Sequence, residues 1–110
     1  YKSLMPELLA KHTDMEIFEA DDQMELRANC VYILPSKKFM TVKGKKLQLH
    51  EKLSSNKPNN AIDVFFESVA TEYQAKAIGV ILSGTGTDGT KGLEMIKQNG
   101  GVAIVQDPIT

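Results

Sequence analysis

An apolar run followed by a glycine-rich loop constrains the fold of this chain more than any other feature. The stretch is "GVILSGTGTDGTKGL", residues 79–93. Residues 78–82 read as a strand, Gly84, Gly86 and Gly89 follow with G-x-G-x-x-G spacing, and a helical pattern comes next. That spacing is the dinucleotide-binding fingerprint. A strand, a tight loop and a helix in this order predict a right-handed βαβ unit.

Two helices are predicted around this loop. Apolar residues at helical spacing predict the first over residues 61–73, and the second covers residues 90–98 with Leu93 and Ile96 facing inward. An Asn-Gly-Gly sequence at 99–101 is typical of a helix C-cap. The stripe of the first helix consists of Ile62, Phe65, Phe66, Val69, Ala70 and Tyr73.

The remaining apolar segments predict strands and one short helix. Continuous apolar runs at 29–35, 76–82 and 102–105 favour strands buried on both faces, and residues 15–20 favour another strand. Leucines at helical spacing predict a short helix over residues 3–11. We therefore expect an α/β fold with a doubly wound, mostly parallel sheet.

Residues 39–51 predict a β-hairpin that turns at Lys43-Gly44-Lys45, where Gly44 can supply a positive φ. One face of this hairpin is polar, so we expect it at the edge of the sheet. Residues 52–61 are rich in Ser, Asn, Lys and Pro and predict a surface loop within one domain rather than a linker.

The size and charge of the chain limit its partners. The 110 residues suffice for one core, and 13 Lys and Arg against 14 Asp and Glu give a net charge of −1. No basic field is available for nucleic acid or an anionic membrane, and no apolar run approaches the ~20 residues of a membrane span. The single cysteine, Cys30, fits a buried strand position in a protein of the reducing cytoplasm.

Asp88 lies inside the glycine loop, where a bound diphosphate would have to sit. At an effective dielectric of ~20, two unit charges ~4 Å apart repel by about 4 kcal/mol, whereas a helix end contributes at most ~2 kcal/mol. A nucleotide loop nevertheless meets its formal pattern, because Asp107 follows Gly89 by 18 residues and could hold a ribose. Three interpretations stay open: a structural N-cap, a functional carboxylate, and a dinucleotide site that uses Gly84, Gly86, Gly89 and Asp107.

The two histidines do not indicate a catalytic base. His12 reads as a polar residue at a helix end and His50 as an exposed hairpin residue. His, Asp, Glu and Cys nowhere show the spacing of metal ligands, so we expect neither a metal nor another cofactor.

Four segments, taken together and in order, resemble the catalytic domain of the chemotaxis protein-glutamate methylesterases (CheB type). They are "VILSGTGTDGTKGLEMIKQNGGVAIVQDP", "VYILPSKKFMTVKGKKLQL", "NNAIDVFFESVA" and "YKSLMPELLAKHTDMEIFEADD". The segment "SGTGTDGT" is most similar to the corresponding segment of hybrid proteins that fuse methylesterase and receptor methyltransferase domains. This resemblance implies hydrolysis of glutamyl methyl esters, and deamidation of glutamines, on chemoreceptor signalling helices by a Ser-His-Asp triad.

The resemblance assigns Asp88 as the triad aspartate and the backbone N–H of Thr85 as an oxyanion-hole donor. The family's serine turn and catalytic histidine have no counterpart here, and the chain begins with Tyr1 rather than Met. We therefore expect residues 1–110 to be the C-terminal part of one methylesterase domain, inactive alone. Expected partners are methylated chemoreceptor helices and a fused methyltransferase or response-regulator domain.

Overall fold

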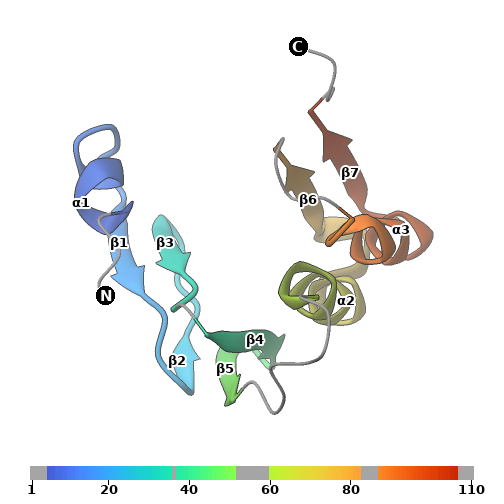
Figure 1. Ribbon diagram of the computed structural model, residues 1–110, viewed down its shortest axis with the longest axis horizontal. Helices are drawn as coiled ribbons and strands as arrows, with labels where there is room; N and C mark the ends of the chain where they lie inside the picture. The colour runs from blue at the N-terminus through green and yellow to red at the C-terminus, as the bar shows by residue number, and fades with distance from the viewer. Residues whose placement is uncertain (1–4, 36, 52–59, 83–86, 107–110) are drawn as a thin grey trace.

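A computed structural model describes residues 5–35, 37–51, 60–82 and 87–106 of the chain. Figure 1 shows its helices and strands. In chain order they are α1 (Met5–Ala10), β1 (Glu16–Glu19), β2 (Met24–Glu25), β3 (Cys30–Ile33), β4 (Lys38–Lys43), β5 (Lys46–Glu51), α2 (Ala61–Tyr73), the short 3-10 helix η1 (Gln74–Lys76), β6 (Ile78–Ile81), α3 (Thr90–Gln98) and β7 (Val102–Val105). The helices predicted over residues 61–73 and 90–98 are confirmed.

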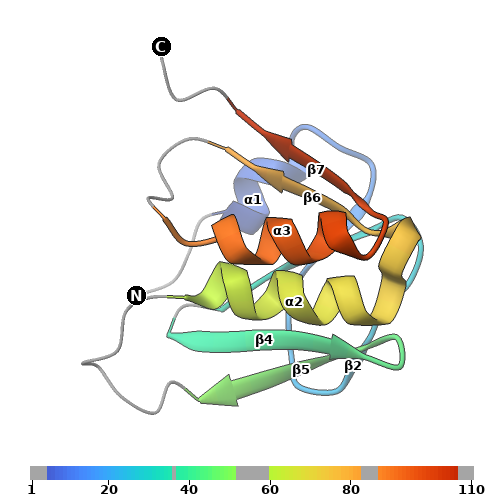
Figure 2. The ribbon, with the colours of Figure 1, turned by 90° about the vertical axis from the view of Figure 1, so that its right-hand side faces the viewer.

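Helix α2 lies between the β4–β5 hairpin and α3, as Figure 2 shows. Its apolar stripe divides between two hydrophobic clusters. Phe65 packs on the cluster that contains Met40, Val42 and Leu47 of the hairpin. Phe66 packs on a second cluster formed by Ala70, Ala77 and Ile96. Because both clusters share α2, the position of this helix is fixed from two sides.

The predicted hairpin is confirmed, with a two-residue turn between the paired residues Lys43 and Lys46. Gly44 and Lys45 both have positive φ, 59° and 64°, as a type I′ turn requires. Among the described residues, the hairpin lies at the edge of an antiparallel sheet rather than of a parallel one, with β4 as the edge strand. It joins the unpredicted short strand β2 in an antiparallel sheet of order β2-β5-β4, whose apolar face packs on α2.

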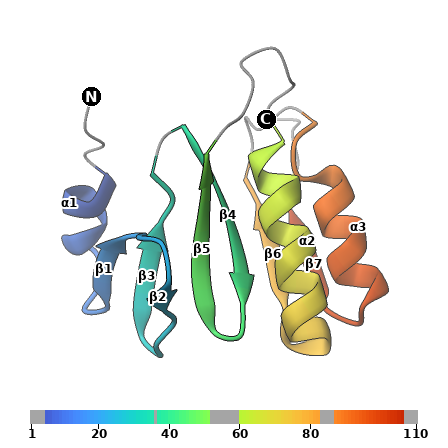
Figure 3. The same cartoon turned by 90° about the horizontal axis from the view of Figure 1, so that it is seen from below.

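The parallel strands form two separate pairs in the described part of the chain. Strand β1 pairs with β3, and β6 pairs with β7. The pairs lie on opposite sides of the hairpin, as Figures 1 and 3 show. The predicted α/β class with parallel pairing is confirmed, because β6 and β7 pair in parallel on either side of the crossover helix α3, and β1 pairs in parallel with β3.

The expectation that these strands are buried on both faces is wrong. In β6 and β7, Ile78 is 65% exposed, Val80 is 49% exposed and Ile104 is 50% exposed. Val80 and Ile104 are register partners, so their side chains share one bare face. Every residue of β3, Cys30 included, is only half-buried. The apolar runs are strands, but other residues do not cover both of their faces.

Candidate active site

Asp88 is held at the N-terminus of α2 rather than at that of its own helix. Its half-buried carboxylate accepts the backbone N–H of Ile62 at Oδ2 and that of Asp63 at Oδ1, each at 3.0 Å. These two amides belong to the first turn of α2, which has no intrahelical acceptor for them. The N-cap residue of α3 is Gly89, which makes no side-chain cap. The interpretation of Asp88 as the N-cap of its own helix is therefore wrong.

Asp63 returns the same kind of contact to α3. Its Oδ1 atom accepts the N–H of Gly89 at 3.0 Å and that of Gly92 at 2.8 Å. Asp63 is 9% exposed, so this carboxylate is buried. Helix α2 thus supplies the carboxylate that caps α3, and Asp88, two residues before α3, supplies the carboxylate that caps α2. We call this arrangement of Asp63, Asp88 and their four amide donors the reciprocal cap.

The reciprocal cap also has an electrostatic basis. Helices α2 and α3 lie side by side and run in the same direction (Figure 2), so their N-termini are adjacent. Each N-terminus carries a partial positive charge, and a nearby anion contributes about 0.3–1 kcal/mol, up to ~2 kcal/mol where it is partly buried. Two carboxylates between two helix ends therefore offset the repulsion of the aligned dipoles.

Close approach of the helices makes the reciprocal cap possible. A Cβ atom at Gly92 would lie 2.5 Å from Cβ of Phe66 and 3.2 Å from Cα of Asp63. No ordinary side chain fits at these distances. Glycine at position 92 thus lets α3 come near enough for its amide to reach the carboxylate.

A dinucleotide site would need the backbone N–H of Gly89 as a donor to the diphosphate, and this group is already engaged. Diphosphate binding at a helix N-terminus requires free backbone N–H groups. The N–H of Gly89 already donates to Asp63. The other residues of this interpretation, Gly84, Gly86 and Asp107, lie outside the described residues, as does Thr85 of the expected oxyanion hole.

Neither histidine is a hydrogen-bond partner of Asp88 among the described residues. His50 is exposed on β5, and its Nε2 atom lies 2.8 Å from Oγ1 of Thr41 on the neighbouring strand. His12 is exposed just after α1. Among all the residues that the structure describes, His, Cys, Asp and Glu side chains form no group of three or more that could hold a metal.

The family follows from the whole sequence. Residues 1–110 match the family described as CheB methylesterase. The chain belongs to this family. Asp88 and the amides that hold it are thus part of a CheB-type fold.

The chain is similar to the crystal structure of the Thermotoga maritima CheB methylesterase catalytic domain, with a TM-score of 0.66 and 33% identity. The similarity covers 84% of this chain and 51% of that domain. A protein-glutamate methylesterase/protein-glutamine glutaminase from Maricaulis maris is 32% identical over 114 residues, which cover 100% of this chain and 28% of that protein. An uncharacterized 104.1 kDa protein of Rhodobacter capsulatus is 43% identical over 104 residues, 94% of this chain and 11% of that protein. The chain therefore spans about half or less of the length of these relatives.

Sequence reasoning singled out Asp88 but missed Asp63. A signal was present, because Asp63 occupies the third position of a helix whose apolar stripe was evident. An aspartate in the first turn usually caps its own helix or interacts with its dipole. That it reaches the neighbouring helix depends on how α2 and α3 pack.

Over the residues that the structure describes, no helix is both long and apolar enough to cross a bilayer.

Proposed function

We propose that this chain supplies the triad aspartate, Asp88, of a protein-glutamate methylesterase that also deamidates glutamines. One observation carries the proposal: two consecutive amides of α2 hold the Asp88 carboxylate in a fixed plane. A carboxylate has about four lone-pair positions, and these bonds use two. Asp88 is half-buried, so the remaining positions can accept the Nδ1–H of a histidine.

In this mechanism a serine attacks the carbonyl of the glutamyl methyl ester, and a histidine takes the serine proton. The imidazolium then donates this proton to the departing methoxide oxygen, so that methanol leaves, and water hydrolyses the acyl-enzyme by the same route. Asp88 keeps the imidazole in the required tautomer and stabilises the imidazolium that forms in each half-reaction. The backbone N–H of Thr85 is proposed as one donor to the oxyanion. No cofactor takes part.

The serine and the histidine are proposed to come from polypeptide outside residues 1–110, in the same methylesterase domain. The apolar face of β6 and β7 supports this assignment. Ile78, Val80 and Ile104 are at least 49% exposed on strands that pair in parallel. Parallel sheets are ordinarily covered on both faces. The chain spans only 51% of the Thermotoga domain, so the other half of such a domain is the proposed cover.

The proposed substrates are methylated glutamates on the signalling helices of chemoreceptors, and the proposed location is the cytoplasm. Relatives much longer than this chain support a fused methyltransferase or response-regulator domain as a further partner. The proposals of substrate and location follow from the family, and the proposal of a fused domain follows from the greater length of the relatives.

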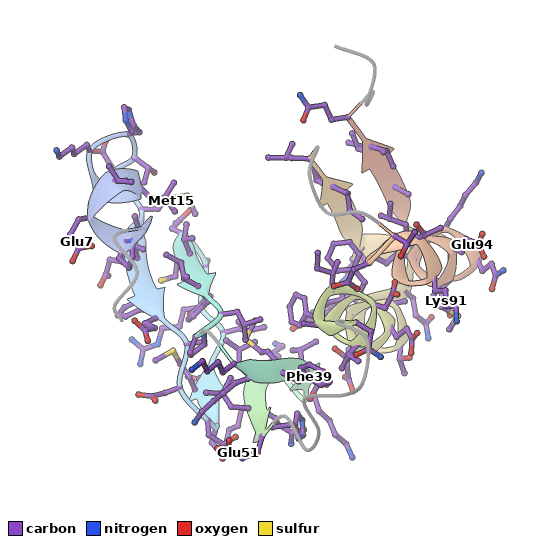
Figure 4. The ribbon with its side chains drawn as sticks, in the orientation of Figure 1. Glu7, Met15, Phe39, Glu51, Lys91 and Glu94 are labelled. Atoms are coloured by element: carbon purple, nitrogen blue, oxygen red, sulfur yellow. The ribbon has the colours of Figure 1, made fainter. Side chains whose placement is uncertain are left out.

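Asp88→Asn in the full-length protein tests the proposal. We expect turnover of a methylated receptor to fall by about 10⁴, the scale of triad aspartates, with the fold retained. Glu94→Gln is the matched control, because this exposed carboxylate on α3 points away from α2 (Figure 4). A turnover that stays within threefold of the parent protein would remove Asp88 from the mechanism. The 110-residue chain alone should show no turnover.

A further inference from the structure

We propose that Asp63 is a positioning residue, which sets the location of Asp88 through the first turn of α3. This inference rests on the proposed function, because it concerns the carboxylate that orients the histidine. Asp63 touches neither the histidine nor the substrate in this proposal.

The hydrogen bonds between residues 63 and 88–89 form a closed ring. The N–H of Asp63 donates to Oδ1 of Asp88, and the N–H of Gly89, the next residue along, donates back to Oδ1 of Asp63. Both bonds are 3.0 Å long. Such a ring fixes the peptide that carries Asp88 as well as its side chain. Asp88 therefore cannot shift relative to α2 without breaking a bond that Asp63 makes.

The burial of Asp63 shows that this contact is more than a surface cap. In the described part of the chain it is the one buried polar side chain, at 9% exposure. A buried carboxylate is costly unless hydrogen bonds compensate for the lost water. The amides of Gly89 and Gly92 provide that compensation, and both lie in the segment that leads from Asp88 into α3. The carboxylate thus anchors this segment against α2.

Asp63→Ala leaves the α2 amides in place for Asp88 but frees the Gly89 and Gly92 amides. Residue 88 can then move, and a displacement of about 1 Å at a catalytic group can cost on the order of 10²-fold. We expect kcat to fall by about 10- to 100-fold with KM changed by less than about threefold. Asp63→Asn should recover most of this loss, because a single oxygen accepts both amides. Glu94→Ala is the matched control.

A double-mutant cycle in the full-length protein separates positioning from general destabilisation. If Asp63 acts through Asp88, Asp63→Ala should lower kcat in the parent background and leave it unchanged, within about threefold, in the Asp88→Asn background. An equal loss in both backgrounds, or no loss in the parent, would overturn the inference.

Amide hydrogen exchange gives a readout that does not depend on activity. In Asp63→Ala, exchange should accelerate at Gly89 and Gly92, which lose their acceptor, and also at Ile62, whose acceptor is Asp88. Unchanged protection at Ile62 would show that Asp88 keeps its place without Asp63, and would refute positioning. Full activity of Asp88→Asn would instead refute the proposed function. In that case the amide exchange rate of Ile62 in Asp63→Ala would still decide whether Asp63 positions Asp88.

Discussion

Replacing either aspartate of the reciprocal cap by asparagine tests what makes the cap stabilising. The stabilisation could depend on how many carboxylate oxygens accept hydrogen bonds, or on how deeply the carboxylate is buried. Asp63 uses one oxygen for both of its bonds, whereas Asp88 uses one oxygen for each. The Asp63→Asn variant can therefore keep both bonds with its one amide oxygen. In the Asp88→Asn variant, the NH₂ group must lie opposite a backbone N–H in either rotamer. Acceptor number therefore predicts that Asp88→Asn destabilises the domain more than Asp63→Asn does. Burial alone predicts the opposite, because Asp63 is buried and Asp88 is only half-buried.

The size of each effect follows from the bonds that change. A hydrogen bond to a charged group contributes about 1.5–3 kcal/mol and a neutral one about 0.5–1.5 kcal/mol. Asp63→Asn makes two bonds neutral, at about 1–1.5 kcal/mol each, which should lower the free energy of unfolding by about 2–3 kcal/mol. Asp88→Asn makes one bond neutral and leaves one amide unsatisfied, for a total of about 2.5–4.5 kcal/mol. Both variants lose one charge at a helix N-terminus, so that contribution cancels in the comparison.

Urea unfolding of the complete methylesterase domain, followed by circular dichroism, measures this difference. With an m-value of about 2 kcal/mol per molar, the Asp88→Asn midpoint should lie about 0.3–0.8 M below that of Asp63→Asn. Glu94→Gln removes an exposed charge from α3 and should stay within about 0.5 kcal/mol of the parent domain. A lower midpoint for Asp63→Asn than for Asp88→Asn would refute the reasoning from acceptor number.

Three further substitutions probe the packing of the site, the contact of α2 with the hairpin and the exposed face of β6. Gly92→Ala forces a methyl group against Phe66 and should destabilise the domain by about 1–3 kcal/mol, as measured by thermal unfolding. Ser68→Ala removes the hydroxyl that accepts the N–H of Val42 at 3.0 Å, so it should cost about 1–3 kcal/mol and speed amide exchange at Val42; unchanged exchange would contradict this. Val80→Lys should change the stability of the 110-residue chain by less than about 0.5 kcal/mol, because Val80 is 49% exposed. The same change should prevent the complete domain from folding, as judged by soluble yield, and a normal yield would contradict the proposed cover.

The helices and the hairpin could be predicted because their signals are local. The apolar stripe of α2 repeats at helical spacing within one segment, and the predicted bounds 61–73 agree with Ala61–Tyr73. The hairpin turn depends on Gly44 and its neighbours alone. Helix α3 ends as its sequence predicts, with Gly100 at a positive φ of 92° and the N–H of Gly101 donating to the carbonyl of Ile96.

Strand burial could not be predicted in the same way. An apolar run indicates a strand that other residues can cover, but it does not say which residues cover it. Ile78 and Val80 read as buried from composition, yet these residues are 65% and 49% exposed. Their cover is proposed to come from polypeptide beyond residues 1–110. A prediction made from this chain alone therefore assigns the strands correctly and their surroundings incorrectly.

The site shows why a glycine spacing can match a fingerprint without sharing its function. The segment "DGTKG", residues 88–92, places a carboxylate beside two glycines whose amides both donate to Asp63. In a dinucleotide site, amides at such a helix N-terminus would bind a phosphate. Here an internal carboxylate takes that place, and Asp88 is directed to α2 in exchange. Gly89 and Gly92 thus hold α2 and α3 together through Asp63. In the same contact, α2 holds Asp88 by two amides and leaves other lone pairs of its carboxylate for a histidine.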